Sequence, residues 1–309
     1  MLLRKALLVA QKQLRSAGVR SEEASSIIQV VTGLSKEEIL SDGARVLVDR
    51  DVNMIKYFVS ERLRRVPLPY LTGKSNFYRD TFLVGTNVLC PRKETEVLVD
   101  STMHAVESLQ TQKNSLLTVV DAGTGSGCIA CSVKKYSAWP IHMLGVDMSF
   151  HALEVAKHNA RNLDVDVSFL QSSWLSAFSA DSLDIIVSNP PYLSSFDWKN
   201  CEPELSYEPY TALVGGTTGT EMLKQIIESS IFCLRTGGVL LLEHGKDQIE
   251  QVKNLLEKNG WFFYALPTIN QIAAPQGLLT MIAYLTTEVM AEWQLHEKEN
   301  GLFPSPDRI

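Results

Sequence analysis

The tetrapeptide Asn189-Pro190-Pro191-Tyr192 carries the residue types that could hold a reactive NH2 group. It follows Ile185–Ser188, an apolar run that is typical of a buried strand. Two consecutive prolines fix the backbone and remove two N–H donors, so we expect nearby carbonyl oxygens to be available as acceptors. Together with the side-chain carbonyl of Asn189, they can accept both hydrogens of an NH2 group. Tyr192 adds a flat face for a planar amide or base.

This arrangement suits methyl transfer to nitrogen. An amide nitrogen is a poor nucleophile because its lone pair is delocalised, and acceptors on both hydrogens orient it for attack on an activated methyl group. We predict that Asn189, Pro190 and Tyr192 are catalytic, that Pro191 joins them in binding the substrate, and that no metal is needed. The exocyclic amine of adenine fits the same arrangement. A rigid proline turn with a surface tyrosine is the alternative without chemistry.

A second motif, Asp121-Ala122-Gly123-Thr124-Gly125-Ser126-Gly127, joins an apolar strand to an expected helix. Its glycines permit tight turns and close approach of the backbone to a ligand. Dinucleotide sites use similar loops, and helix packing alone would also explain the glycines. Asp121 ends its strand, and Asp147, 26 residues on, ends the next, where a carboxylate can accept both ribose hydroxyls. These acids favour an adenosyl ligand without phosphates.

From residue 115 onward, apolar strands alternate with helices, which predicts an α/β domain with a parallel sheet covered on both faces. Residues 1 to about 73 have helical spacing, and Pro67 and Pro69 exclude a continued helix. A hairpin turning at Gly85-Thr86-Asn87 is expected between the two. We predict a helical domain over 1–75, a β-hairpin linker over 76–92 and an α/β domain over 93–309. The strands are expected at 116–121, 142–147, 166–171, 183–188 and 238–243, the helices at 127–135, 151–162, 219–234 and 247–259, and an antiparallel pair at Trp261–Leu266 and Leu278–Leu285.

Composition limits the class of protein. The 309 residues include five cysteines, too few for a disulfide framework, and we expect Cys128 and Cys131 to be plain packing residues. Met1–Leu14 lacks the continuous apolar core of a signal peptide, and no long apolar run predicts a membrane span, so we expect a cytoplasmic protein. Residues 1–75 hold 13 Lys and Arg against 8 Asp and Glu, whereas the remainder holds 16 against 27. The acidic remainder disfavours long contact with nucleic acid.

Several stretches together resemble the HemK/PrmC family, the glutamine methyltransferases that modify peptide chain release factors. The resemblance runs from about residue 65 to residue 250. It rests on Pro67-Leu68-Pro69-Tyr70-Leu71-Thr72-Gly73, Pro91-Arg92-Lys93-Glu94-Thr95-Glu96, the glycine loop, Asn189–Tyr192, Glu208-Pro209 with Ala212-Leu213, and Leu242-Glu243-His244-Gly245.

The resemblance implies a Rossmann-like class I methyltransferase domain with a mostly parallel seven-stranded sheet, a small N-terminal helical bundle and a linking β-hairpin. It implies S-adenosylmethionine as cofactor and S-adenosylhomocysteine as product, with Gly123–Gly127 at the methionine end and Asp147 on the ribose. Trp174 would contact adenine, and Asn189 would touch both cofactor and glutamine. The implied substrate is the glutamine of the Gly-Gly-Gln loop of class 1 release factors, gripped elsewhere by the N-terminal bundle.

Two positions depart from the family pattern. Lys93 stands where proline is usual, and Ser173 stands where an acid often receives the adenine amino group, which predicts a weaker contact there. The stretch from Ile269 to Gly277 also lacks the expected arginine-containing ending.

Other residues permit two interpretations. Glu94 and Glu96 support the site or cap a helix, and His244 is a base or, more often at a strand end, a packed residue. Trp174 is an adenine shelf or core. Tyr207, Glu208 and Tyr210 line the substrate mouth or form a structural loop. The competing functions are an adenine-directed DNA or RNA methyltransferase and a cofactor-binding assembly factor without turnover.

Overall fold

The computed structural model describes residues 1–113, 115–266 and 279–284. The chain divides into two compact units. The first is Met1–Lys74 together with Glu202–Tyr207, and the second is Ser75–Cys201 with the described residues from Glu208 onward. The predicted stretch Ile269–Gly277 and the tail lie outside the described residues.

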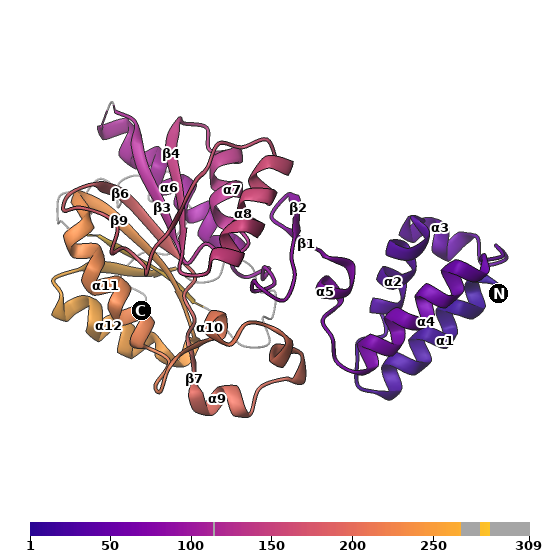
Figure 1. Cartoon of the computed structure of the whole chain (residues 1–309). Helices are drawn as coiled ribbons and strands as arrows, with labels where there is room; N and C mark the ends of the chain where they lie inside the picture. The colour runs from indigo at the N-terminus through magenta and orange to yellow at the C-terminus, as the bar shows by residue number, and fades with distance from the viewer. Residues whose placement is uncertain (114, 267–278, 285–309) are drawn as a thin grey trace. The chain divides into compact units, whose positions relative to one another are not determined.

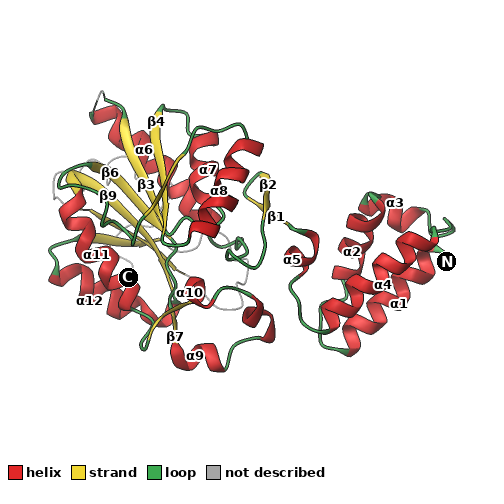
Figure 2. Ribbon diagram, viewed as in Figure 1, coloured by secondary structure: helices red, strands yellow, loops and turns green. Residues whose placement is uncertain are grey.

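The first unit is helical, as its apolar spacing predicts (Figure 2). Ser35 and Glu38 form a capping box at the start of the third helix, in which each side chain receives the other residue's backbone N–H. The prolines do end the fourth helix at Leu63, but a short fifth helix then starts at Leu68, because proline is tolerated in a first helical turn. The helices are α1 (Leu3–Ser16), α2 (Glu23–Thr32), α3 (Lys36–Ser41), α4 (Asp49–Leu63) and α5 (Leu68–Thr72).

The segment Glu202–Tyr207 belongs to this helical unit although its sequence neighbours do not. Arg62, which is almost fully buried, pairs with Glu23 at 2.6 Å and with Glu204 at 3.4 Å. Arg65 also pairs with Glu204, at 3.0 Å, and the hydroxyl of Tyr207 donates to a backbone carbonyl of α4's C-terminal end. Charged side chains distant in sequence therefore hold this segment, which contains a short 3₁₀ turn, η1 (Pro203–Tyr207).

The second unit has a seven-stranded sheet in its described part, with strand order β10-β11-β9-β6-β3-β4-β5. Figure 1 labels its strands β9, β6, β3 and β4. Neighbours from β9 to β5 run parallel, and β10 and β11 form the expected antiparallel pair beside β9. The predicted α/β fold with a mostly parallel sheet is confirmed. The strands are β3 (Leu117–Ala122), β4 (Ile141–Asp147), β5 (Ser168–Gln171), β6 (Leu183–Ser188), β9 (Leu234–His244), β10 (Phe262–Leu266) and β11 (Leu279–Tyr284).

Alternate residues of the central strands face two separate cores. Ile185 and Val187 of β6 pack with residues of α6 and α7, whereas Ile186 packs with residues of α11 and α12. Cys128 and Cys131 lie in the first core, so their predicted packing role is confirmed. The helices are α6 (Glu96–Gln112), α7 (Cys128–Tyr136), α8 (Phe150–Asn162), α9 (Ser195–Lys199), α10 (Tyr210–Leu213), α11 (Glu221–Cys233), α12 (Ile249–Lys258) and the 3₁₀ turn η2 (Lys246–Gln248). A two-stranded parallel pair, β7 (Leu193–Ser194) with β8 (Val214–Gly216), follows the proline turn.

The predicted hairpin exists, but its expected turn is wrong. Strands β1 (Lys74–Phe77) and β2 (Asp80–Leu83) pair across Tyr78-Arg79. Tyr78 has a φ of +57°, a strained value for an aromatic residue. Its backbone N–H donates to Glu96 at 2.8 Å and its hydroxyl to Asp100 at 2.7 Å. Gly85 instead starts a separate turn after β2, closed by a backbone hydrogen bond of 3.1 Å.

None of the helices in these described ranges has the length and apolar character needed to span a bilayer.

Asn159 of α8 joins the hairpin to the glycine loop. Its Oδ1 accepts the Leu83 N–H at 2.7 Å, and its Nδ2 donates to the carbonyls of Leu83 at 3.0 Å and Ser126 at 2.9 Å. Asn159 is almost fully buried, so water cannot supply hydrogen bonds to these backbone groups in its place. One side chain thus fixes the end of β2 against the loop that precedes α7.

We expect Asn159→Ala to lower the free energy of unfolding by about 3 kcal/mol, because three hydrogen bonds are lost and buried partners are left unpaired. Urea unfolding followed by circular dichroism measures this change. Asn162→Ala, an exposed asparagine in the same helix, is the matched control and should change it by less than about 0.5 kcal/mol. Equal effects of the two substitutions would contradict the role given to Asn159.

Candidate active site

A cavity of about 440 Å³ lies within the α/β unit. Several of its lining residues follow the carboxyl ends of β3, β4, β5 and β6, the edge at which parallel sheets bind ligands. Its volume suits a small-molecule cofactor. Of the site residues predicted from sequence, those that line it are Gly123, Gly125, Asp147, Trp174, Asn189 and Pro191.

Asp147, at the end of β4, faces this cavity with a carboxylate that is already anchored. Its Oδ2 accepts the Gly125 N–H and its Oδ1 accepts the Ser149 N–H, each at 2.9 Å. Burial raises the pKa of Asp147, and these backbone donors lower it in part. Each carboxylate oxygen has two lone pairs, so capacity is left on both for a pair of ligand hydroxyls.

Two glycines shape the wall beside Asp147. A Cβ on Gly123 would stand 3.0 Å from the Cζ3 atom of Trp174, so the absence of a side chain lets the indole lie against the backbone. A Cβ on Gly125 would meet no atom within 4 Å, although Gly125 lines the cavity. Both have positive φ, of +78° and +54°, which glycine adopts without steric cost. The loop therefore forms an open cradle with one aromatic wall.

The other predicted residues of the loop lie behind this lining. Asp121 is fully buried, and its Oδ2 accepts the Thr124 hydroxyl at 2.7 Å and the Ala130 N–H at 3.2 Å. Burial raises the pKa of Asp121 to about 7. Ser126 is held through its carbonyl by Asn159, and Gly127 caps α7 with a φ of +77°. Their direct contact with a cofactor stays a prediction; in this structure they brace the loop.

The Asn-Pro-Pro-Tyr turn begins directly after β6. Asn189 lines the cavity, and its Nδ2 donates to the hydroxyl of Thr95 at 3.0 Å. Pro191 also lines the cavity, whereas Pro190 is buried and Tyr192 packs against the core beside α11 and α12. Burial raises the pKa of the Tyr192 phenol well above its usual range. The Tyr192 carbonyl accepts Gln248 Nε2 at 2.8 Å, so that oxygen, which we expected to be available, has a partner.

One wall of the cavity is formed by the turn after β2, which sequence reasoning did not assign to the site, and by the start of α10, where it named Tyr210 as one possible lining residue. Thr86, Asn87, Val88 and Leu89 contribute from the first segment, and Tyr210–Ala212 contribute from the second. The resemblance stretch Glu208–Leu213 was the available signal for α10. Nothing in the local pattern of 86–89 points to a ligand, because only the tertiary fold brings it to the sheet edge.

For several residues that permitted two interpretations, the structure now favours one. Glu208 is buried and structural, accepting the Cys90 N–H at 3.0 Å and pairing with Arg92 at 2.5 Å, while Tyr210 lines the cavity. Glu96 holds the hairpin turn and pairs with Lys93. His244 is fully buried, with Nδ1 at 2.8 Å from the Gly245 carbonyl, and burial lowers its pKa.

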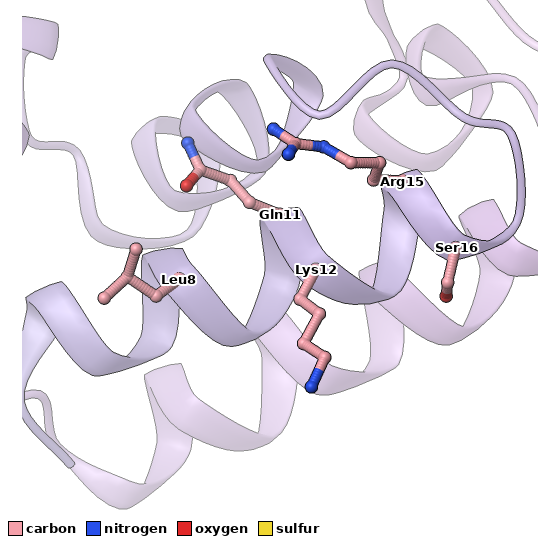
Figure 3. Close-up of a pocket in the computed structure, with 5 residues that line it drawn as sticks. All are labelled: Leu8, Gln11, Lys12, Arg15 and Ser16. Carbon is pink, nitrogen blue, oxygen red and sulfur yellow. The ribbon is translucent and has the colours of Figure 1, made fainter.

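A second hollow lies on the surface of α1 and is lined by Leu8, Gln11, Lys12, Arg15 and Ser16 (Figure 3). All five come from one helix, and the side chains of Lys12 and Arg15 leave it in different directions. A single helix supplies no opposing wall, so this hollow lacks the enclosure of a small-molecule site.

The covered parallel sheet, with the glycine loop, Asp147 and the proline turn around one cavity, has the arrangement expected of a Rossmann-like methyltransferase. The family comparisons agree with this class. Residues 91–200 match the family described as "Methyltransferase small domain", and residues 5–73 match the "PrmC N-terminal domain".

Curated relatives narrow the class further. The release factor glutamine methyltransferase of Pasteurella multocida is 33% identical over 252 residues, covering 77% of this chain and 84% of the relative. That of Caulobacter vibrioides is 33% identical over 261 residues, covering 83% and 88%. The chain therefore belongs to the release factor glutamine methyltransferase family, and the predicted HemK/PrmC membership is confirmed.

Solved structures support the fold alone. The hMettl16 catalytic domain, solved in complex with the MAT2A 3′UTR hairpin 1, aligns with a TM-score of 0.51 at 17% identity, over 80% of this chain and 85% of that one.

The cofactor of this enzyme class, S-adenosylmethionine, fits the donor set of the cavity. Asp147 offers acceptors for ribose hydroxyls, Trp174 an aromatic wall for adenine, and the loop at Gly125 an open cradle for the amino acid end. Ser173 also lines the cavity, where its hydroxyl gives a weaker acceptor than an acid would. These individual contacts stay predictions.

We expect Gly123→Ala to weaken S-adenosylmethionine binding by about tenfold, roughly 1.4 kcal/mol. The added methyl group would crowd the Trp174 ring and strain a positive φ. Isothermal titration calorimetry measures the change. Gly85→Ala, where a Cβ meets nothing within 4 Å, is the control and should leave the Kd within about twofold. An unchanged Kd for Gly123→Ala would contradict the adenine wall.

Asp121 predicts a pH dependence of stability. Its pKa rises from 3.8 when unfolded to about 7 when folded, so between these values the unfolded chain ionises while the folded one stays protonated. The wild type therefore loses stability as pH rises through this window, and Asp121→Asn does not. The difference in unfolding free energy, variant minus wild type, should grow by on the order of 2 kcal/mol from about pH 4 to about pH 7, then level off. Urea titrations across this range measure it, and a flat difference would contradict the shift.

Proposed function

We propose that this enzyme transfers the methyl group of S-adenosylmethionine to the side-chain amide nitrogen of the glutamine in the Gly-Gly-Gln loop of class 1 release factors. The observation that carries the proposal is the position of Asn189. Its side chain lines the same cavity as Asp147 and Trp174, and it is the first residue after the buried strand β6. Membership of the release factor glutamine methyltransferase family supports the choice of substrate.

In this proposal the residues of the turn act by orientation. The Asn189 carbonyl accepts one hydrogen of the substrate amide, and a backbone carbonyl of the proline turn accepts the other. Held this way, the nitrogen directs its lone pair at the methyl carbon while Asp147 and the glycine cradle keep the cofactor in place. S-adenosylmethionine, when bound, supplies a methyl group activated by its positively charged sulfur. The nitrogen forms a bond to carbon, the carbon–sulfur bond breaks, and the nitrogen gives one proton to water.

The N-terminal unit provides the proposed second contact with the release factor. Residues 1–75 carry a positive excess, with 13 Lys and Arg against 8 Asp and Glu, which suits an acidic partner surface. We place the activity in the cytoplasm, because five cysteines in 309 residues are too few for the disulfide framework of a secreted protein. We expect no direct contact with nucleic acid.

A methylation assay with tritiated S-adenosylmethionine and a purified class 1 release factor tests the proposal. We expect label on the wild-type factor and none on a factor whose loop glutamine is alanine. Asn189→Ala should lower kcat by about a hundredfold, because the aligned amide is lost. Asn162→Ala, an exposed asparagine of α8, controls for the substitution itself.

Two results would contradict the proposal. Label on adenine-containing DNA or RNA oligonucleotides, with none on the factor, would favour an adenine-directed enzyme. Binding of S-adenosylmethionine without transfer to either substrate would favour an assembly factor.

A further inference from the structure

The carboxyl group of Glu243 is buried next to Asn189 and has no place in the chemistry described so far. Glu243 lies near the end of β9, one residue after Leu242, which pairs with Ser188 of β6. Asn189 follows Ser188, so the two side chains leave neighbouring parallel strands at the same edge. Glu243 is 1% exposed, and both carboxylate oxygens lack a hydrogen bond of normal geometry. A buried acid left in this state calls for an explanation.

Thr95 is the hydrogen-bond partner of Asn189 and also affects the pKa of Glu243. It is almost fully buried at the start of α6, and its hydroxyl accepts the Nδ2 of Asn189 at 3.0 Å. A threonine hydroxyl that accepts one hydrogen bond still has its own hydrogen to donate. Neither Glu243 oxygen has a hydrogen-bond partner in the structure, while Thr95 and, more weakly, Asn189 lower the pKa of Glu243. The hydrogen of the Thr95 hydroxyl can therefore turn toward this nearby carboxylate.

The direction of these bonds decides how the Asn189 amide points. The NH2 and carbonyl ends of an asparagine have nearly the same shape, so only hydrogen-bond partners distinguish them. An ionised carboxylate accepts and never donates, so in a bond with Glu243 the Thr95 hydroxyl must be the donor, and it then accepts from Asn189 as observed. The NH2 end of Asn189 is then directed at Thr95, and the carbonyl end is left for the substrate.

We propose that Glu243, acting through Thr95, is a positioning residue that keeps the carbonyl oxygen of Asn189 directed at the substrate amide. This inference rests on the proposed function, since it names what prepares the acceptor that the reaction needs. A protonated Glu243 could itself donate to Thr95 or to the Asn189 carbonyl, and the orientation would no longer be fixed.

The inference carries a pH dependence. Burial is the main cause that raises the pKa of Glu243 to about 7; Thr95 and Arg92 act to lower it, and Glu94 acts to raise it. Arg92 is already paired with Glu208 at 2.5 Å, so it does not neutralise Glu243 fully. Tyr192 also faces Glu243, and its raised pKa keeps it neutral here. The ionised form, which orients Asn189, therefore increases as pH rises through about 7.

The first test follows the Asn189 NH2 signals by NMR from about pH 5 to about pH 9 and needs no substrate. The signals are assigned by their loss in Asn189→Ala. In the wild type they should shift with a midpoint near the pKa of Glu243, and in Glu243→Gln and Thr95→Val this shift should disappear. Thr102→Val is the matched control, because Thr102 is a buried threonine of the same helix whose hydroxyl donates to the Leu98 carbonyl instead. A shift that persists in Thr95→Val would overturn the inference.

The second test is the methylation assay with the same variants. Thr95→Val and Glu243→Gln should lower kcat by about tenfold with KM changed by less than about twofold, because binding is kept and orientation is lost. Thr95→Ser should recover at least about a third of the wild-type kcat, since it restores the hydroxyl. Glu243→Gln should also abolish the rise of kcat with pH. If Thr95→Val and Thr95→Ser lower kcat equally, the hydroxyl has no such role and the inference fails.

The two tests separate the inference from the proposed function. A wild-type protein with the Thr95-dependent NMR shift but no transfer to the release factor would overturn the proposed substrate and support the orientation of Asn189. Transfer without the shift would support the function and overturn the inference.

Discussion

The parallel pairing of β6 with β3 on one side and β9 on the other determines which side chains meet at the cavity. Val187 pairs with Asp121, and Ser188 pairs with Leu242, so the glycine loop, Asn189 and Glu243 all leave the sheet at the same level. The Ser188 hydroxyl reinforces this register by donating to the Ala122 carbonyl at 2.5 Å. A slip of one residue would exchange the two faces of β6 and place Asn189 in a core. Such a slip is unfavourable because it would bury the polar amide of Asn189 and disrupt the packing of both apolar cores.

The same burial explains which parts of the fold were predictable from sequence. Continuous apolar strands and amphipathic helices show their identity locally, and most of their predicted bounds lie within two residues of the observed ones; β9 is an exception, starting at Leu234 instead of residue 238. The hairpin turn was not predictable in this way. Gly85 carries the usual turn signal, yet the chain reverses at Tyr78-Arg79, because Glu96 and Asp100 hold Tyr78 in an unfavourable backbone conformation. A local pattern does not contain partners that lie 18 and 22 residues away.

The location of the site at the carboxyl ends of the strands was predictable from sequence. The contacts that each site residue makes were less predictable. Asp121 and Asp147 look equivalent in sequence, since each ends a strand of the same sheet. In the structure, Asp147 lines the cavity. Asp121 is instead buried beneath the loop, where it accepts hydrogen bonds from Thr124 and Ala130. Which of the two carboxylates is buried depends on how the loop folds back over its own strand. Long-range charge pairing is equally hidden, as with Glu204, whose partners Arg62 and Arg65 lie 142 and 139 residues away.

In the proposed reaction the acceptor for the substrate is the neutral amide of Asn189, which must be held in one orientation. The surroundings of Asn189 matter for this reason. A charged acceptor would need no orientation, but a buried carboxylate in direct contact with the substrate could take up a proton and lose its acceptor role. An asparagine carbonyl cannot be protonated near neutral pH, yet its amide can rotate to present the wrong end. A carboxylate that acts on Asn189 through the Thr95 hydroxyl combines a fixed orientation with an acceptor that stays unprotonated. In the proposed arrangement Glu243 sets the direction through Thr95. Of these three residues, Asn189 is the one that lines the cavity. In this proposal the helix that follows Thr95 and the strand that ends at His244 support the chemistry through residues that do not line the cavity.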